Sequence, residues 1–228
     1  MEKTTPMAVK TVSLREDMTH DGVTVLTYQI DYPEFQSAAY QLAVAAINRY
    51  YQMKALEIRR HVEEELYPAA VEQAEQAAED GFPTMVYQVL TTYRVTYNDG
   101  CILSLYEERY EFTGGAHGST VRESQTWNLQ KCSRIRLRDL FGCAEPCKEV
   151  ILREVRRQIA QNPALYFENA DALAAETLNE DSFYCTPQGI VVYYQQYDIA
   201  PYSSGIREFL LPYGGCVYEP RRTCFNVK

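Results

Sequence analysis

The stretch YQVLTTYRVTYNDGCILSLYEERYEF, from Tyr87 to Phe112, decides the fold that this sequence predicts. β-Branched and aromatic side chains occupy every second position of its first half, namely Tyr87, Val89, Thr91, Tyr93, Val95 and Tyr97. That period of two places them on one face of a β-strand. Asn98, Asp99 and Gly100 then form a strong hairpin signal, and a second extended run follows from Ile102 to Phe112. The stretch therefore predicts two long strands joined by a tight turn.

The residues before this stretch predict two strands and a long helix. Residues 8–16 and 22–32 are expected to be strands around an Asp21-Gly22 turn, with Pro33 ending the extended run. A helix is expected from Phe35, because residues at steps of three and four predict one inward face: Ala39, Leu42, Ala46, Tyr50, Met53 and Leu56. Tyr67-Pro68 predicts a kink or restart of this helix, and Gly81 predicts its end.

The residues after the stretch alternate less regularly between strands and helices. The expected elements are a strand over 119–129, a turn at RLRDLFG, a helix over 147–162, a helix over 168–178, a hairpin over 183–195 and a strand over 208–212. Because regular βαβ alternation is missing, the predicted class is α+β, a mainly antiparallel sheet packed against a long N-terminal helix and shorter C-terminal helices. Two subdomains are expected, over residues 1–130 and 131–228.

Composition and charge restrict the classes of partner. The chain has 228 residues, of which 46% are hydrophobic, so it can bury a sizeable core. Its net charge of −9 argues against nucleic acid and favours attraction of a basic protein. The 19 tyrosines suit a contact surface for protein or carbohydrate.

The sequence contains no stretch that predicts membrane insertion or export. No run approaches the roughly 18 apolar residues of a membrane span, and MEKTTPMAVKTVSL lacks the apolar core of a signal peptide. The chain as written is expected to be soluble and cytoplasmic. The alternative is an excised extracytoplasmic domain whose anchor is missing from the sequence.

The seven cysteines predict thiols in a reducing compartment, because an odd number does not close a disulfide framework. Cys143 and Cys147 have the spacing of a zinc ligand pair, but a structural zinc site needs a second pair. Cys216 and Cys224 lie too far apart in sequence to supply it. We therefore expect no metal site and no cofactor.

The sequence predicts a binding protein more than an enzyme. It contains three histidines, His20, His61 and His117, and lacks GxSxG, HExxH, GxxxxGK[ST] and GxGxxG motifs. A general acid, base or nucleophile needs partners that orient it, and no such group is recognisable. No catalytic residue is assigned, although an enzyme assembled from dispersed carboxylates and His117 stays open as an alternative.

The loop TGGAHGST, Thr113 to Thr120, is the first candidate ligand-binding site. Gly114, Gly115 and Gly118 permit positive φ angles, which hairpin turns often require. In one interpretation the glycines serve geometry and His117 caps backbone groups. In the other, exposed backbone N–H groups and His117 meet a ligand, since loops on rigid sheets often carry binding residues.

The loop YYQQYDIAPYSSG, Tyr193 to Gly205, is the second candidate. Pro201 favours an extended residue before it, so Tyr197 and Tyr202 are expected to flank a stiff turn. Tyrosines held in this way make rigid contacts at low entropic cost. The alternative is that they cover the sheet edge and pack the core.

Three segments together carry a family resemblance: GGAHG, RLRDLF and FYCTPQGIVVYYQQYDIAPYSSGIREFLLPY. They resemble the extracytoplasmic domain of RsiV-type anti-sigma factors, with the C-terminal likeness spanning residues 135–213. The strands, long helix and hairpin before them are similar to the companion N-terminal domain, which also precedes the catalytic domain of some peptidoglycan deacetylases. Together the two likenesses cover most of the chain.

This resemblance implies a non-catalytic receptor in an extracytoplasmic setting. The best understood members bind lysozyme and then permit proteolysis of the anti-sigma factor. For this chain it implies lysozyme or a cell-wall glycan as the partner and the two loops as the contact site. Two alternatives are kept: a cell-wall-acting enzyme that uses His117, and a cytoplasmic regulatory protein that retained only the fold.

Overall fold

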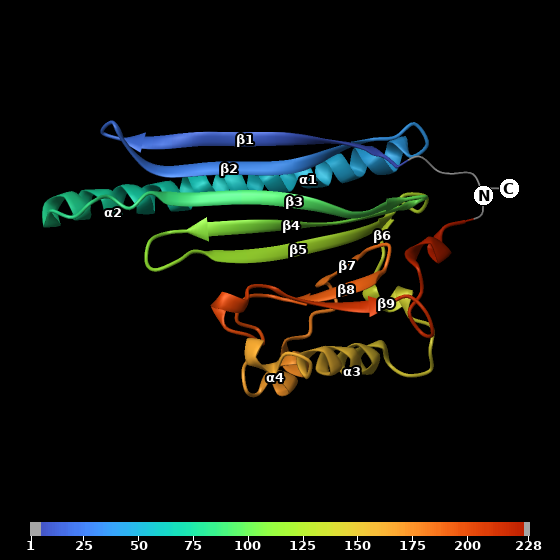
Figure 1. Cartoon of the computed structure of the whole chain (residues 1–228). Helices are drawn as coiled ribbons and strands as arrows, with labels where there is room; N and C mark the ends of the chain where they lie inside the picture. The colour runs from blue at the N-terminus through green and yellow to red at the C-terminus, as the bar shows by residue number, and fades with distance from the viewer. Residues whose placement is uncertain (1–5, 226–228) are drawn as a thin grey trace. The chain divides into compact units, whose positions relative to one another are not determined.

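The chain has an α+β fold built on a large, mostly antiparallel sheet, seen in a computed structural model that describes residues 6–225 (Figure 1). Six strands lie in the order β1-β2-β3-β4-β5-β6, and three more form a separate sheet in the order β7-β8-β9. The strands of the large sheet are β1 Ala8–His20, β2 Val23–Gln36, β3 Tyr87–Asp99, β4 Ile102–Phe112, β5 Ser119–Asn128 and β6 Ser133–Arg134. The predicted fold class is confirmed.

Strand β2 has an antiparallel neighbour on one side and a parallel neighbour on the other. It pairs antiparallel with β1 along its whole length and parallel with β3 through Leu26–Ile30 only. The expected end of this strand at Pro33 is wrong, because the strand continues to Gln36. Pro33 lies beyond the segment paired with β3, so the missing N–H of proline is tolerated there.

A continuous helical segment connects β2 to β3, as a parallel strand pair requires. It consists of α1 Gln41–His61, a π-helical turn η1 Val62–Leu66 and α2 Tyr67–Asp80. The predicted restart at Tyr67-Pro68 is confirmed, with the proline in the first turn of α2. The predicted end is confirmed too, since Gly81 is the C-cap residue with φ 74°.

The side of α1 that faces the sheet differs from the predicted one, and the helix begins at Gln41 instead of Phe35. Its buried residues are Ala43, Val44, Ile47, Tyr51 and Ala55. Leu42 and Met53, which the periodicity placed inward, are 84% and 54% exposed. Two apolar stripes therefore run along this helix, and the stripe that packs against β2 is the one with more small and β-branched side chains.

The chain divides into two compact units, which we name the helix unit and the disulfide unit. The helix unit comprises Ala8–Tyr93 and Glu107–Val121; the disulfide unit comprises Met7, Arg94–Tyr106 and the chain from Arg122. Strands β3, β4 and β5 contribute residues to both units. The division into subdomains at residue 130 stays a prediction.

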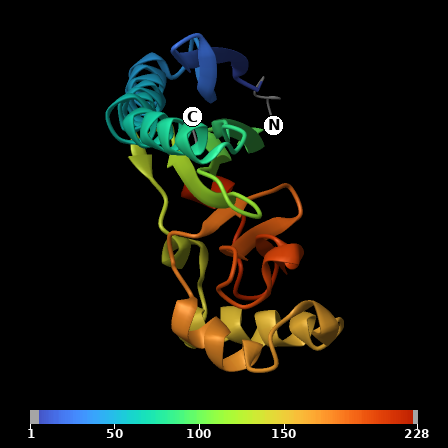
Figure 2. The ribbon, with the colours of Figure 1, turned by 90° about the vertical axis from the view of Figure 1, so that its left-hand side faces the viewer.

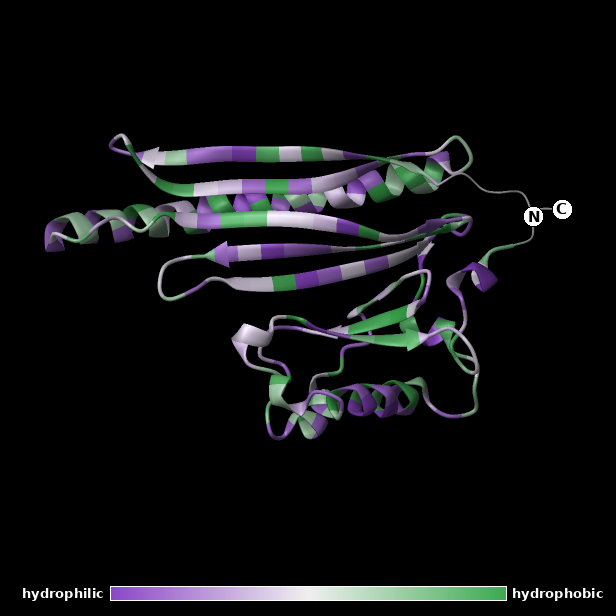
Figure 3. Ribbon diagram, viewed as in Figure 1, coloured by the Kyte–Doolittle hydropathy of each residue, from purple (hydrophilic) through white to green (hydrophobic). Residues whose placement is uncertain are grey.

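The disulfide unit contains the second sheet and the C-terminal helices. Its remaining elements are η2 Leu137–Leu140, α3 Cys147–Ile159, η3 Pro163–Leu165, α4 Ala170–Thr177, β7 Phe183–Cys185, β8 Gly189–Tyr194, η4 Tyr202–Ser204, β9 Arg207–Pro212 and η5 Pro220–Thr223. Figure 3 shows hydrophobic residues concentrated in β8 and β9, and every residue of β8 is buried. Helix α3 packs against β9 and α4, and its buried residues include Ile151, Leu152 and Val155.

Four of the seven cysteines form disulfides, so the expectation of free thiols throughout is wrong. Cys101 bonds to Cys224 and Cys143 bonds to Cys216, with Cα–Cα distances of 6.0 and 5.0 Å. The partners lie 123 and 73 residues apart, so sequence spacing could not reveal them. The remaining cysteines within the described part of the chain are free: Cys132, Cys147 and Cys185.

Candidate functional site

The candidate site is the loop Gln195–Gly205 of the disulfide unit, between β8 and β9. The structure brings Tyr197 and Tyr202 together, with ring centroids 6.0 Å apart and ring planes 34° apart. Pro201 precedes the short helix that begins at Tyr202, and its backbone is extended, with ψ 162°. The prediction that the tyrosines flank a stiff turn is thus consistent with the geometry.

Tyr197 has an unusual backbone conformation and a large exposed surface. Its φ is 68°, a left-handed value that non-glycine residues with bulky side chains rarely adopt. The residue is 55% exposed, so burial of its ring offsets the strain only in part. Strained residues of this kind persist where the surroundings fix them, and they concentrate at binding and catalytic sites.

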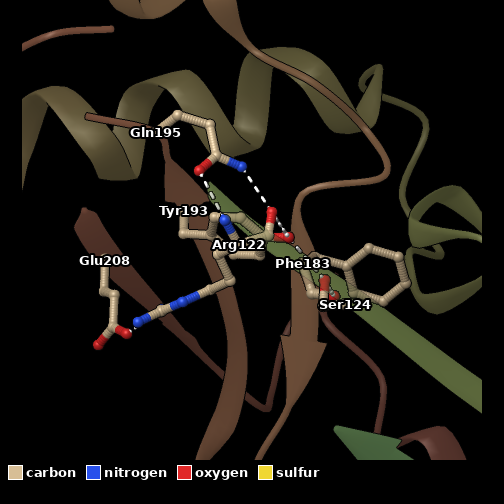
Figure 4. Close-up of polar contacts among 6 residues, drawn as sticks. All are labelled: Arg122, Ser124, Phe183, Tyr193, Gln195 and Glu208. Atoms are coloured by element: carbon tan, nitrogen blue, oxygen red, sulfur yellow. Dashed lines mark hydrogen bonds and ion pairs between the residues drawn. The ribbon is translucent and has the colours of Figure 1, made fainter. Parts of the chain in front are cut away.

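The loop is anchored at its start by a double hydrogen bond to strand β5. The amide of Gln195 bonds both backbone groups of Arg122, as Figure 4 shows. The backbone N–H of Arg122 donates to Gln195 Oε1 at 3.0 Å, and Gln195 Nε2 donates to the Arg122 carbonyl at 2.6 Å. A side-chain amide here acts like the backbone of a neighbouring strand.

The side chain of Arg122, whose backbone holds Gln195, is itself held by an ion pair and by aromatic rings. Arg122 is 7% exposed and forms an ion pair with Glu208 of β9 (Figure 4). Its guanidinium lies over the ring of Tyr106 at 4.1 Å from the ring centroid. The ring of Tyr193 lies 5.4 Å from the same guanidinium. A buried arginine paired with a carboxylate and aromatic rings is satisfied in charge and in packing.

Strand β5 makes further contacts with β7 and β8 beside this arginine. Ser124 Oγ donates to the carbonyl of Phe183 at 2.6 Å and lies 3.0 Å from the hydroxyl of Tyr193 (Figure 4). Burial raises the pKa of Tyr193 above its ordinary value, so its hydroxyl stays protonated as a donor. The support of the loop is therefore a connected polar network within a buried environment.

The interior of the loop is packed and hydrogen-bonded. The backbone N–H of Gln195 donates to the Asp198 carboxylate at 2.7 Å, and burial raises the pKa of that carboxyl. Ile199 and Ala200 are fully buried, and the Ile199 carbonyl accepts from the N–H of Phe167 at 3.1 Å. The loop thus exposes Tyr197 and leaves Tyr202 half-buried, while its centre is fixed.

The end of the loop is fixed to the segment around Leu165. Ser204 Oγ donates to the Leu165 carbonyl at 2.8 Å, and Leu165 is itself an exposed apolar residue. We name Tyr197, Tyr202 and Leu165 together the tyrosine surface: the two rings are in contact, and the loop is joined to Leu165 through the backbone carbonyl of that residue. Rigid aromatic side chains on an anchored loop are the kind of group that dominates binding energy at interfaces.

The other predicted loop, TGGAHGST, lies in the helix unit and has the geometry of a turn. Gly114 and Gly115 have φ angles of 99° and 89°. Gly118 is buried, and a Cβ there would collide with the carbonyl of Glu111 and the ring of Tyr110. His117 is exposed, and its Nδ1 donates to the Gly118 carbonyl at 3.1 Å. These contacts fit the interpretation of a capped turn; ligand contact by His117 and the glycines stays a prediction.

The sequence did not reveal the residues that support the tyrosine surface: Arg122, Gln195, Asp198 and Leu165. Asp198 carried a weak signal, because aspartate near a proline is typical of turns that bond their own backbone. Arg122 and Gln195 carried none, since their contact joins residues 73 positions apart. The left-handed conformation of Tyr197 was equally hidden, because glycine is the residue type that usually marks it.

The described residues hold no group of three or more His, Cys, Asp and Glu side chains arranged to bind a metal ion. Within residues 6–225, no helix has both the length and the apolar character needed to cross a membrane.

Comparisons with known protein families divide the chain into two matches. Residues 21–120 match the family model described as "Deacetylase PdaC", and residues 138–214 match the model described as "Protein of unknown function (DUF3298)". The first match agrees with the likeness of the N-terminal part to a domain that accompanies some peptidoglycan deacetylases. No curated protein matches the chain significantly.

Two solved structures share this fold along almost the whole chain. One is a DUF3298 family member from Bacteroides fragilis, with TM-score 0.65 and 20% identity, covering 93% of this chain and 92% of the other. The second is a DUF3298 family protein from Pseudomonas aeruginosa, with TM-score 0.57 and 19% identity, covering 91% of each chain. At this identity the likeness concerns the fold, so the function has to be argued from the site.

Proposed function

We propose that this chain is a non-catalytic binding module of the RsiV-type receptor kind, which recognises lysozyme or a cell-wall glycan through the tyrosine surface. The observation that carries the proposal is the exposed, strained Tyr197 beside Tyr202 on a loop anchored at both ends. Maintaining a left-handed tyrosine has a cost of order 1 to 3 kcal/mol, which packing alone does not explain when the ring is exposed.

Aromatic side chains suit both proposed ligands. Tyrosine offers an apolar ring and a polar hydroxyl, so it contacts the apolar faces of protein side chains or of sugars while bonding their polar groups. Because the loop is fixed in advance by Gln195, Asp198 and Ser204, little conformational entropy is lost on binding. Tyr197, Pro201 and Tyr202 are the proposed contact residues.

The disulfides support a location outside the reducing cytosol. Disulfides persist in oxidising environments and are rare in the cytosol of mesophiles. Two of them in one unit favour the extracytoplasmic setting over the cytoplasmic one. This setting is also where a protein would meet lysozyme and cell-wall fragments.

The experiment is a calorimetric titration with lysozyme and, separately, with soluble peptidoglycan fragments, each at low and high salt. A chain of charge −9 attracts any basic protein, and salt above roughly 0.15 M screens that attraction. Binding that survives high salt is the expected result for one of the two ligands. Loss of all binding at high salt would overturn the proposal.

Two variants locate the contact. Tyr202→Ala should weaken binding at least about tenfold without unfolding the chain, which is the usual size of a lost aromatic anchor. Tyr197→Asn should do the same while changing the free energy of unfolding by less than about 0.5 kcal/mol, because asparagine tolerates the left-handed conformation. Tyr40→Ala, at a half-buried tyrosine of the helix unit, is the matched control and should bind normally.

The same titration tests the TGGAHGST loop. His117→Ala should leave affinity unchanged if the loop is a turn, and should weaken binding if His117 touches the ligand. Unchanged affinity in both Tyr197→Asn and Tyr202→Ala, together with a loss in His117→Ala, would move the site from the tyrosine surface to this loop.

A further inference from the structure

The helical segment Gln41–Asp80 exposes one long face that has no partner within its own unit. At 1.5 Å per residue the segment is about 60 Å long. One side of it packs on β2, and the opposite side faces away from the strands (Figure 2). We name the opposite side the outer helix face.

The first half of the outer helix face is apolar. Leu42 and Met53 are largely exposed, Ala46 between them is exposed, and Leu56 is half-buried. A groove of about 640 Å³ lies beside this stripe, and Tyr50, Met53 and Leu56 line it together with the charged side chains of Lys54, Glu57, Arg59, Arg60 and Glu63. Apolar side chains at steps of three and four on an exposed helix face are typical of a helix that packs against another helix.

The charges on this face are segregated along its length. Arg49 and Arg60 are exposed on the first half, and neither forms an ion pair among the described residues. Glu64, Glu72 and Glu79 are exposed on the second half and are likewise without ion pairs there. From Val62 to Tyr93 the sequence contains no lysine or arginine. The first half therefore carries apolar and basic side chains together with the exposed Glu57, and the second half carries acidic side chains with no basic one.

We propose that the outer helix face binds the same face of a second copy of this chain, with the two helical segments antiparallel. A partner that was acidic or basic throughout would match one half of the face and leave the other half unmatched. A second copy related by a twofold axis matches both halves at once, because each contact then occurs twice. The juxtaposition of Arg49 and Arg60 with the acidic half on one continuous helix carries the proposal.

A twofold axis near Val62 gives the best pairing of residue types. Residues at equal separation on either side of Val62 then meet across the axis. Arg60 meets Glu64 of the second copy, and Arg49 meets its Glu75, an exposed carboxylate that also lies 3.1 Å from His20 Nε2 of its own chain. The exposed Leu42 meets the exposed Phe82, which follows the C-terminal end of the helical segment. Leu56 meets Pro68 in the same register. The Leu56–Pro68 contact lies between the two kinds of ion pair, and the Leu42–Phe82 contact lies outside them at the ends of the segment.

The contact is large enough for a weak dimer. A strip about 60 Å long and about 10 Å wide buries roughly 600 Å² per copy, at the lower end of the range for specific interfaces. Interfaces of this size have dissociation constants that reach the micromolar range. The proposal is independent of the proposed ligand, because the outer helix face belongs to the helix unit and the tyrosine surface to the disulfide unit.

Sedimentation velocity of the full chain between about 1 and 200 µM tests the dimer, since this range spans a micromolar dissociation constant. Arg49→Glu and Glu75→Arg should each raise the dissociation constant at least about tenfold, because each creates two like-charged contacts. An equimolar mixture of the two variants should restore the dimer, since every altered pair is then oppositely charged.

The control is Arg15→Glu, which changes the net charge by the same amount on the exposed surface of β1 and should leave the dimer unchanged. Met53→Glu should weaken the dimer as a separate check on the apolar stripe. A chain that stays monomeric over the whole range overturns the proposal. A dimer that persists in both charge variants, or that the mixture does not restore, overturns the antiparallel pairing.

Discussion

The two compact units keep their structure by different means. The helix unit relies on one long amphipathic helix against strands and contains no disulfide among its described residues. The disulfide unit contains both disulfides and most tyrosines whose pKa is raised by burial, namely Tyr97, Tyr184, Tyr193, Tyr194 and Tyr213. Its candidate site is supported by contacts of strands β5, β8 and β9 and by hydrogen bonds within an irregular loop.

The contrast between the two predicted loops follows from this difference. TGGAHGST meets its geometric requirement with glycine, so its conformation carries no strain that needs an explanation. The loop with Tyr197 meets a similar requirement with a bulky residue and compensates with long-range hydrogen bonds. Residue types that suit a conformation indicate structure, and residue types that oppose it point to function.

The largest expected effect is the loss of the Cys101–Cys224 disulfide. Its removal by Cys101→Ser with Cys224→Ser should destabilise the disulfide unit by about 4 to 5 kcal/mol, because the bond closes a long loop in the unfolded chain. Denaturant unfolding followed by the fluorescence of Trp127, which lies in this unit, measures the change.

Hydrogen exchange of the α1 amides is the control for this change, because α1 lies in the helix unit. Its protection should persist at denaturant concentrations that unfold the region around Trp127. Loss of both signals at the same midpoint would mean that the two units unfold as one, and the contrast between them would not hold for stability.

A smaller effect, of about 2 to 4 kcal/mol, is expected from Gly118→Ala in the helix unit, because a Cβ there meets a backbone carbonyl and a packed ring. Gly115→Ala is the matched control. Its positive φ makes a Cβ unfavourable by about 1 to 2 kcal/mol, but the space around it is open. Thermal unfolding of the two variants compares them, and equal losses would contradict the steric explanation.

The smallest effect concerns pH and the disulfide unit. Burial raises the pKa of Tyr97 to about 12, compared with an ordinary value of about 10. Above pH 10 the unfolded chain releases this proton while the folded chain keeps it, so the contribution is present below pH 10 and is lost as the pH rises through 12. Between pH 10 and pH 12, the free energy of unfolding of the Tyr97→Phe variant should fall less than that of the natural chain. An equal fall in both proteins would contradict the raised pKa of Tyr97.

Much of the fold could be predicted because most elements have a regular period. The alternation from Tyr87 to Tyr97 and the stop at Gly81 were confirmed, and the predicted turn between the two strands lies at Gly100–Cys101, because Asn98 and Asp99 still belong to β3. The inward side of α1 was wrong because period alone does not choose between two apolar stripes. That choice depends on which stripe fits β2, which is a tertiary property.

The candidate site could be predicted less well. Pro201 and the two tyrosines were recognisable from local sequence, and the structure does bring the rings together. The disulfides and the Arg122–Gln195 contact join distant residues, so no local pattern indicated them. Local patterns found the exposed rings, and the contacts that hold them in place required the structure.

The π-helical turn η1 between α1 and α2 has a consequence for how sequences of this type change. A π turn contains one residue more than an α-helix needs, and this is how a helix accommodates an insertion without breaking. Val62 and Leu66 stay buried on either side of three exposed glutamates, Glu63, Glu64 and Glu65. A relative that lacks one of these glutamates would keep the same buried side against β2 in a purely α-helical segment. An alignment gap inside this helix would then mark a change in helix length that leaves the packing against β2 unchanged, and not a domain boundary.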